Sequence, residues 1–196
     1  MKNIYRNVVI PKYRSPKTCK HKYELSIMNF KTLSAQRYSV RSYSGEPVTE
    51  EQLQYILECA RLAPSAVNLQ PWKFYVMTSQ QDRELLQQCY KRDWLSQAPL
   101  YILLTVQHDV EWVRSDGKRH GDIDIAIAAE HICLAAAEQG LGSCWVCNFN
   151  AQLCHELLNL PETEEPVVLI PIGKAAAGMQ PTEKKRKDLT EIVVRR

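Results

Sequence analysis

The apolar run PLYILLTVQ, residues 99–107, constrains the fold of this chain more than any other segment. Its apolar side chains follow one another without polar alternation, which is typical of a central strand covered on both faces. Shorter apolar segments indicate further strands, and both faces of such a sheet need helices to cover them. The expected strands are WKFYVMT (72–78), PLYILLTVQ (99–107), SCWVCNF (143–149) and PVVLIPIG (166–173).

Helical signals separate these strands. Thr49 with Gln52 three residues later matches a capping box, and Ser79 is a second candidate N-cap. The longest helical pattern is rich in Ala, whose small side chain allows close helix packing, and Gly140 ends it. Helices and strands alternate with few hairpin signals, so the fold class is α/β or α+β with a sandwiched sheet. The expected helices cover residues 29–37, 49–62, 80–90, 122–140 and 151–160.

Charge and length divide the chain into two parts. A length of 196 residues suits one domain with one core. The 25 Lys and Arg outnumber the 22 Asp and Glu, but seven of the basic side chains lie in residues 1–27 beside Glu24 alone. We expect residues 1–27 to be a basic, flexible extension, with Met28 as a candidate functional start, and residues 28–196 to form the single domain. That domain is weakly acidic and shows no footprint for nucleic acid.

The sequence has little or no signal for a membrane span, a secretory leader, a disulfide framework or a metal site. There is no apolar run of 18 residues and no apolar core of a secretory signal, so we expect a cytoplasmic protein without membrane contact. The seven cysteines, an odd number in mostly apolar segments, favour reduced and buried thiols. Cys144 and Cys147 lie three residues apart, which puts their sulfurs on opposite faces of a strand. Since no second pair stands at zinc-finger spacing, a metal or dithiol site is the less favoured interpretation.

Two basic clusters predict an anion site. Glycine-rich nucleotide motifs are absent, so a phosphate has to be held by side chains. Arg37, Ser39 and Arg41 fall where the first helix ends, and two guanidiniums beside a hydroxyl suit a phosphate. Arginines alone are more often a solvated face, but the second cluster at 184–187 can close on the same group. Together the clusters favour a phosphate-bearing cofactor.

The loop PSAVNLQPW, residues 64–72, is the second candidate site. Two prolines restrict its backbone, and Asn68 and Gln70 present amide edges between them. A planar heterocycle with alternating donors and acceptors matches such amides. The alternative is an ordinary connecting loop with a buried Trp.

Taken together, these motifs resemble the FMN-dependent nitroreductase family over roughly residues 29–196. The resemblance implies an α+β fold in which a central mixed or antiparallel sheet is enclosed by helices. It also implies an intertwined homodimer with two FMN sites at the interface. The motifs that carry it are Arg-x-Ser-x-Arg (37–41), Ala-Pro-Ser-x-x-Asn-x-Gln-Pro-Trp (63–72), Gly-Leu-Gly-Ser-Cys-Trp (140–145), Pro-Ile-Gly (171–173) and Lys-Lys-Arg-Lys (184–187).

The resemblance also implies which residues bind the cofactor. One group would hold the phosphate and ribityl chain, a second would meet the ring from the partner subunit, and a third would lie along the ring. At Cys147 and Asn148 the family often has Gly, so bulkier side chains narrow the substrate face here. The first group is Arg37, Tyr38, Ser39 and Arg41, completed by Arg186 and by Lys184 or Lys185; the second is Pro64, Ser65, Ala66 and Asn68, with Gln70 as a further amide of that loop; the third is Trp145, Val146, Cys147 and Asn148.

The implied chemistry is a ping-pong reaction at flavin N5. NAD(P)H reduces FMN, and a nitroaromatic, a quinone or a related small acceptor then takes the electrons. The flavin carries this chemistry, so no catalytic side chain and no metal are expected. Two alternatives stay open: a flavin-binding dimer without turnover, and a reductive dehalogenase of the iodotyrosine type on the same scaffold.

Overall fold

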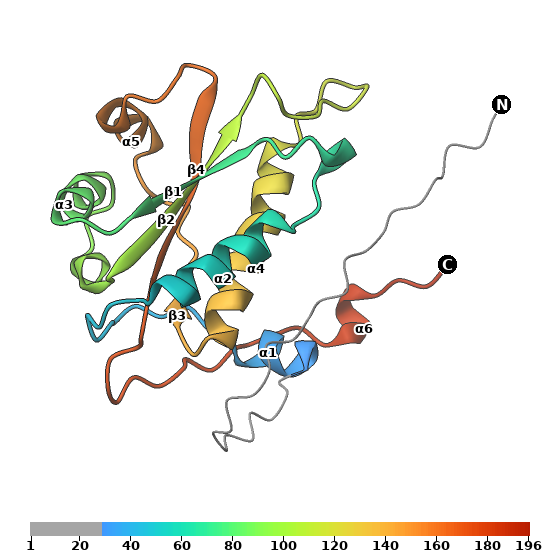
Figure 1. The fold of residues 1–196 in the computed structure, drawn as a ribbon. Coiled ribbons are helices and arrows are strands. Elements are labelled where there is room, and N and C mark those ends of the chain that lie inside the picture. The colour runs from blue at the N-terminus through green and yellow to red at the C-terminus, as the bar shows by residue number, and fades with distance from the viewer. Residues whose placement is uncertain (1–28) are drawn as a thin grey trace, which may run out of the picture.

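A four-stranded antiparallel sheet forms the centre of the molecule (Figure 1). The computed structural model describes residues 29–196. The predicted extension, residues 1–27, and Met28 therefore lie outside the described residues. The strands, in the sheet order β1-β2-β4-β3, are β1 (Trp72–Met77), β2 (Leu100–Gln107), β4 (Glu164–Gly173) and β3 (Gly142–Ser143).

The five expected helices are present, with ends within two residues of the predicted ones. Thr49 and Gln52 form the predicted capping box, and Ser79 and Asp82 form a second one. A third capping box begins the short α6, which the sequence pattern did not predict. The helices are α1 (Phe30–Gln36), α2 (Glu50–Arg61), α3 (Gln80–Cys89), α4 (Gly121–Glu138), α5 (Ala151–Leu158) and α6 (Leu189–Ile192), with 3₁₀ turns η1 (Ala66–Asn68) and η2 (Asp93–Gln97).

The central strand β2 is buried on both faces, as its apolar run predicted. Ile102 and Leu104 pack with α2 and α4, whereas Tyr101 and Leu103 pack with α3 and α5. Figure 1 shows these two helix pairs on opposite sides of the sheet. Each fully buried Ile or Leu contributes about 1.5–3 kcal/mol to folding. An antiparallel sheet between helices makes this an α+β fold.

The predicted strand at 143–149 was wrong over most of its length. β3 ends at Ser143, and only an isolated bridge from Val146 to Leu169 continues the pairing. Cys144 N donates to Pro171 O at 3.3 Å. Proline has no N–H with which to return that bond, so a continuous ladder cannot form beside it. The segment after Ser143 therefore follows the sheet edge as irregular backbone.

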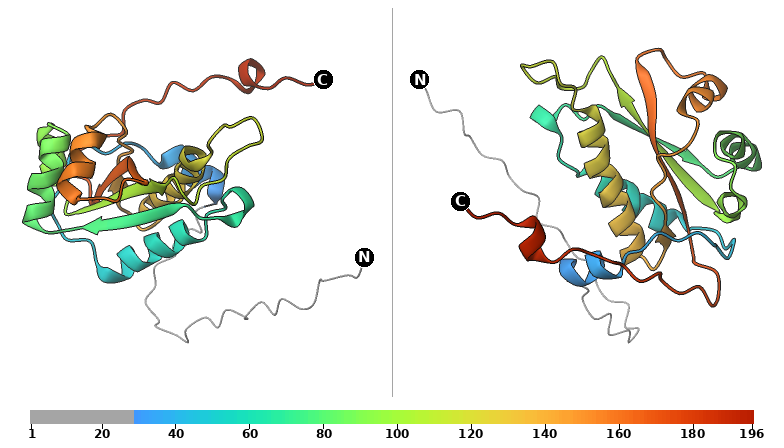
Figure 2. Two further views of the ribbon diagram at one scale, coloured as in Figure 1. Left: turned by 90° about the horizontal axis from the view of Figure 1, so that it is seen from above. Right: turned by 180° about the vertical axis from the view of Figure 1, so that it is seen from behind.

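The C-terminal segment leaves the body of the molecule and carries α6 (Figures 1 and 2). Its apolar side chains Leu189, Ile192 and Val194 are exposed. Within residues 29–196, none of the helices combines the length and the apolar character needed to cross a membrane.

Candidate functional site

The two basic clusters meet in one cleft of about 350 Å³. Four cationic side chains and one carboxylate line it, so the cleft favours an anion. This is the juxtaposition that the spacing of the clusters suggested. The lining residues are Arg37, Tyr38, Ser39, Arg41, Thr182, Glu183, Lys184 and Arg186.

The segment that carries Ser39 and Arg41 is fixed along the sheet edge. Val40 between them is buried, and its N–H donates to Ser143 O at 2.9 Å. The Tyr43 hydroxyl lies 2.9 Å from Val40 O, and burial raises the pKa of Tyr43 well above its usual value. Gly142 allows this close approach, since a Cβ there would overlap Val40 Cγ2. The Ser39 and Arg41 side chains lie on the opposite side, which faces the cleft.

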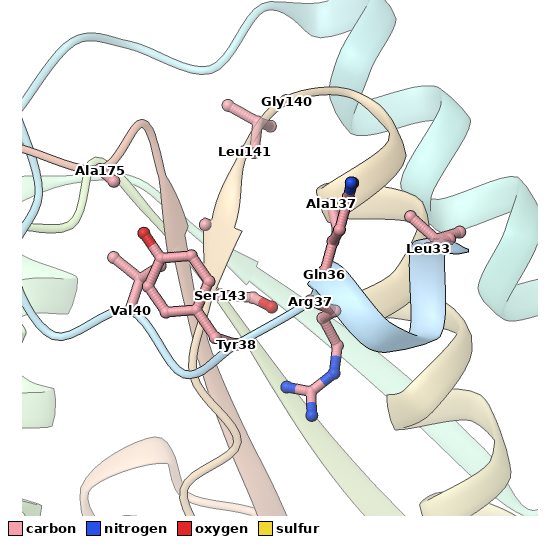
Figure 3. A pocket seen from close by; sticks show the side chains of 11 residues that line it. Leu33, Gln36, Arg37, Tyr38, Val40, Ala137, Gly140, Leu141, Ser143 and Ala175 are labelled. Carbon is pink, nitrogen blue, oxygen red and sulfur yellow. The ribbon is translucent and has the colours of Figure 1, made fainter. Parts of the chain in front are cut away.

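Arg37 is oriented by a carboxylate of α4. Its Nε lies 3.7 Å from Glu130 Oε1. Figure 3 shows the guanidinium extending away from α1, with its terminal nitrogens clear of the labelled neighbours. A guanidinium with free terminal nitrogens can donate two parallel hydrogen bonds to an oxyanion.

Lys184 attaches the C-terminal segment to the end of α1. Its amine donates to Ala35 O and Arg37 O, the carbonyl groups left free where that helix ends. Desolvation of the amine, followed by repulsion from Arg186 and Arg37, lowers the pKa of Lys184. Lys184 thus holds Arg186 beside the cleft and adds positive charge to its wall.

A smaller cavity of about 200 Å³ adjoins the cleft and shares Arg37 and Tyr38 with it (Figure 3). Ser143 lines this cavity, and only 2% of its surface is exposed. Its buried Oγ has no hydrogen-bond partner among the described residues. A buried hydroxyl without a hydrogen-bond partner lowers the stability of a fold. A polar ligand in this cavity would supply the missing partner.

The predicted ring-facing segment, Trp145 to Asn148, begins next to this cleft. Ser39 bridges to Ser143, so the segment continues from the wall that carries the basic side chains. Cys144 is buried and Cys147 is exposed. Burial raises the pKa of Cys144, although Arg41 and Ser39 beside it partly oppose that effect. Trp145 Nε1 donates to Cys147 Sγ at 2.9 Å.

The amide loop, residues 64–70, does not reach the cleft in the same chain. It lies near the start of α4, whereas the wall of the smaller cavity lies near the other end of that helix (Figure 1). Asp124 contacts the loop and Ala137 lines the cavity, and the rise of α4 separates these two residues by about 20 Å. The resemblance implied that this loop meets the ring of the partner subunit's cofactor, and that assignment stays a prediction.

Asp124 is a contact that the sequence pattern missed. Its Oδ1 accepts a hydrogen bond from Ala66 N at 2.9 Å. The only signal is a carboxylate within the apolar run IDIAIAA, and acidic residues in a first helical turn are ordinary. Over residues 29–196, no group of three His, Cys, Asp or Glu side chains is arranged to hold a metal ion.

Comparison with known proteins gives consistent matches. The family model described as the nitroreductase family matches residues 35–92 and 79–174. A crystal structure of a nitroreductase family protein from Clostridium difficile 630 is 36% identical, with a TM-score of 0.79, and the alignment covers 85% of this chain and 98% of that one.

Two curated relatives carry more specific names. An FMN reductase [NAD(P)H] of Bacillus subtilis is 30% identical over 163 residues, 74% of this chain and 65% of that protein. An iodotyrosine deiodinase of Danio rerio is 29% identical over 196 residues, 84% of this chain and 66% of that protein. The chain therefore spans just under two thirds of the length of these two relatives. The family match includes the basic segment after α1 and every strand of the sheet, and from it we conclude that the chain belongs to the nitroreductase family.

Proposed function

We propose that this protein is an FMN-dependent oxidoreductase that takes electrons from NAD(P)H and passes them to a nitroaromatic, a quinone or a related small acceptor. The observation that carries the proposal is the cleft in which Arg37, Arg41 and Arg186 converge with Ser39. The names of the Bacillus FMN reductase and of an FMN-dependent nitroreductase from Clostridium difficile R20291, 29% identical with a TM-score of 0.66, support this cofactor. Bound FMN supplies the hydride and electron chemistry.

The residues of the cleft suit the phosphate end of FMN. Guanidiniums donate charge-assisted bonds to a phosphate dianion, and the Ser39 hydroxyl adds a neutral donor. The Ser143 hydroxyl, buried without a partner beside Tyr38, is available to a polar group further along the ligand. The exposed stretch at Cys147 and Asn148 then forms the wall along which the ring lies.

A second copy of the chain would supply the amide loop. Asn68 and Gln70 lie near the start of α4, and residues 64–70 are not among those that line the cleft of their own chain. A homodimer in which each loop reaches the partner's cleft resolves this separation. Each site would then need both chains.

The exposed surface of α4 supports such a homodimer. The dimer patch, as we name it, contains Phe30, Ile123, Ile127 and Leu134, and Phe30 is 72% exposed. Monomeric proteins rarely leave apolar patches of this kind uncovered. The exposed apolar side chains of α6 offer a further surface that a second copy could cover. A flavin-binding dimer without turnover has the same surfaces, so activity has to be measured directly.

A reductive dehalogenase is the second candidate. The similarity to the deiodinase covers 84% of this chain and supports it. Iodide release from iodotyrosine, compared with NAD(P)H oxidation in the presence of a nitroaromatic or a quinone, separates the two. Iodide release without oxidation of NAD(P)H by the other acceptors would favour the dehalogenase.

Substitution of Arg37 or Arg41, which we call the clamp arginines, tests the proposal. Arg37→Ala or Arg41→Ala should weaken FMN at least about tenfold, roughly 1.4 kcal/mol, because a charge-assisted pair to the phosphate is lost. Riboflavin has no phosphate and should bind the variants and the natural chain equally weakly. Fluorescence titration of both ligands measures this difference.

The matched control is Arg114→Ala. The Arg114 guanidinium pairs with Asp116 at 2.6 Å in an exposed turn away from the cleft. Its loss should leave both affinities unchanged. Equal losses of FMN and riboflavin in the clamp variants would contradict the phosphate assignment, and a colourless protein that rejects FMN would refute the cofactor.

A further inference from the structure

The amide loop has an unusual backbone. Val67, Asn68 and Gln70 have φ angles of 53°, 58° and 52°, all in the left-handed region. Asn tolerates this region, but a β-branched Val there is a true outlier. Such a conformation persists only where the surroundings hold it. The contacts that hold this loop therefore determine how its amides are presented.

Several of these contacts are internal to the loop. Gln70 N donates to Ser65 Oγ at 2.9 Å, Gln70 Nε2 donates to Asn68 Oδ1 at 2.9 Å, and two backbone bonds close the 3₁₀ turn. One contact comes from outside the loop, where Ala66 N donates to Asp124 Oδ1 at 2.9 Å. Among the hydrogen bonds of the described residues, it alone ties residues 65–70 to an element distant in sequence.

Asp124 makes this contact at a cost. It is 2% exposed, and its Oδ2 has no partner among the described residues. A buried carboxylate that is half unpaired destabilises a fold, and the partial positive charge of the first turn of α4 offsets only part of that. The carboxylate is therefore better explained by what it holds than by packing.

We infer that Asp124 is a positioning residue that fixes the left-handed loop and so sets how Asn68 and Gln70 meet the flavin ring. This role rests on the proposed function, because the loop needs a ring to meet. In this inference Asp124 acts through Ala66, whose N–H it accepts. It should therefore affect ring binding and leave the phosphate contribution intact.

The loop itself can be tested in the flavin-free full chain by amide hydrogen exchange. Asp124→Ala should speed exchange of the amides of residues 66–70 at least about tenfold, whereas Asp124→Asn, which keeps an acceptor oxygen, should stay close to the natural chain. The matched control is Asp82→Ala. Asp82 also accepts backbone N–H groups, from Thr78 and Ser79, but in the capping box of α3. Its loss should lower the melting temperature without changing exchange in residues 66–70.

Flavin titration provides the second test. Asp124→Ala should weaken FMN and riboflavin in parallel, each about tenfold, in contrast to the clamp variants. Asp124→Asn should restore both affinities, and Asp82→Ala should change neither.

If Asp124→Ala does not fold, the same hydrogen bond can be removed from the side of its donor, Ala66. Ala66→Pro removes the N–H that Asp124 accepts, and Ser65 already has the extended conformation that a following proline requires. Ala66→Pro should reproduce the loss of both ligands. Unchanged exchange in Asp124→Ala, or an Asp124→Asn variant as impaired as Asp124→Ala, would overturn the inference. Faster exchange in a protein that binds no flavin would instead refute the proposed function and leave the loop-holding role in place.

Discussion

His108 joins three parts of the chain through two carboxylates. Its Nδ1 lies 2.7 Å from Glu111 Oε1, and its Nε2 lies 2.8 Å from Glu165 Oε2. Only the imidazolium donates through both nitrogens, so this geometry matches the protonated ring. Arg119 and the N–H of Gly121 also bond to Glu111, which keeps that carboxylate charged.

These contacts predict a pH-dependent stability. Desolvation lowers the pKa of His108, but the bonds to Glu111 and Glu165 outweigh it and raise the pKa above 6.5. The stabilisation is fully present below pH 6.5 and is lost as pH rises through the folded-state pKa. We expect the natural chain to exceed His108→Gln in melting temperature by about 2–4 °C near pH 6, for a difference of about 1 kcal/mol, and to lose that advantage at higher pH.

Thermal melts of both proteins across a pH series measure this effect. Burial raises the pKa of Glu111, but the bonds from His108, Arg119 and the N–H of Gly121 outweigh it and lower that pKa, so Glu111 stays charged in the window in which His108 acts. A difference in melting temperature that stays constant with pH would contradict the role of the imidazolium.

At this scale the sequence indicates residue types better than it indicates contacts. The arginines of the two basic clusters share a cleft. The sequence could suggest this, because guanidiniums beside a hydroxyl are a recognisable pattern for an anion site. Their contact with FMN stays a prediction. Asp124 could not be predicted, since an acid in the first turn of a helix is ordinary. The left-handed φ of Val67 was also unpredictable, because Val itself disfavours that region.

At the scale of elements, the sheet edge beside Gly142 controls the basic segment. Gly142→Ala would place a Cβ 2.8 Å from Val40 Cβ and into Val40 Cγ2. Val40 is fully enclosed, so the strain of about 1–3 kcal/mol has to move the backbone that carries Ser39 and Arg41. We expect FMN affinity to fall at least about tenfold, and more than riboflavin affinity, in parallel titrations.

Gly45→Ala is the control for a lost glycine. Gly45 has a φ of 78°, but a Cβ there meets no atom within 4 Å. It should lower the melting temperature through backbone strain and leave both flavin affinities intact. Equal effects of the two variants on FMN would show that steric displacement of Val40 has no role.

The elements were predictable where one local signal decided them. Capping residues fixed the starts of α2 and α3, and the apolar run fixed β2. The prediction of a strand after Ser143 was wrong because pairing there depends on Pro171, which is distant in sequence and lacks an N–H. Periodicity describes a strand's own side chains and contains no information about the hydrogen-bonding capacity of its neighbour.

At the scale of the whole molecule, the separation of the amide loop from the cleft leads to a test of assembly. Ile123→Lys puts a charge on the dimer patch, where Ile123 is 44% exposed in the single chain. Burying that charge against a second copy is costly, so sedimentation should show a monomer. The monomer should also lose most of its flavin affinity, although Arg37 and Asn68 are unchanged.

Val110→Lys is the matched control, since Val110 is an exposed apolar residue outside the dimer patch. It should leave both the mass and the flavin affinity unaltered. A monomeric Ile123→Lys variant that still binds FMN tightly would mean that one chain suffices for the site. The family resemblance implied this separation, whereas the motif pattern by itself could not, since it has no distances between motifs.

The attachment of Lys184 to the end of α1 has a consequence for biosynthesis. The residues that complete the cleft, Lys184 and Arg186, follow every strand of the sheet in the chain. A ribosome makes the N-terminal part first, so Arg37 and Arg41 emerge long before the segment that closes on them. During that interval the cleft lacks the positive charges of Lys184 and Arg186. Cofactor loading therefore belongs to the period after the sheet has been synthesised, and a pulse of FMN during translation should leave the growing chain unlabelled.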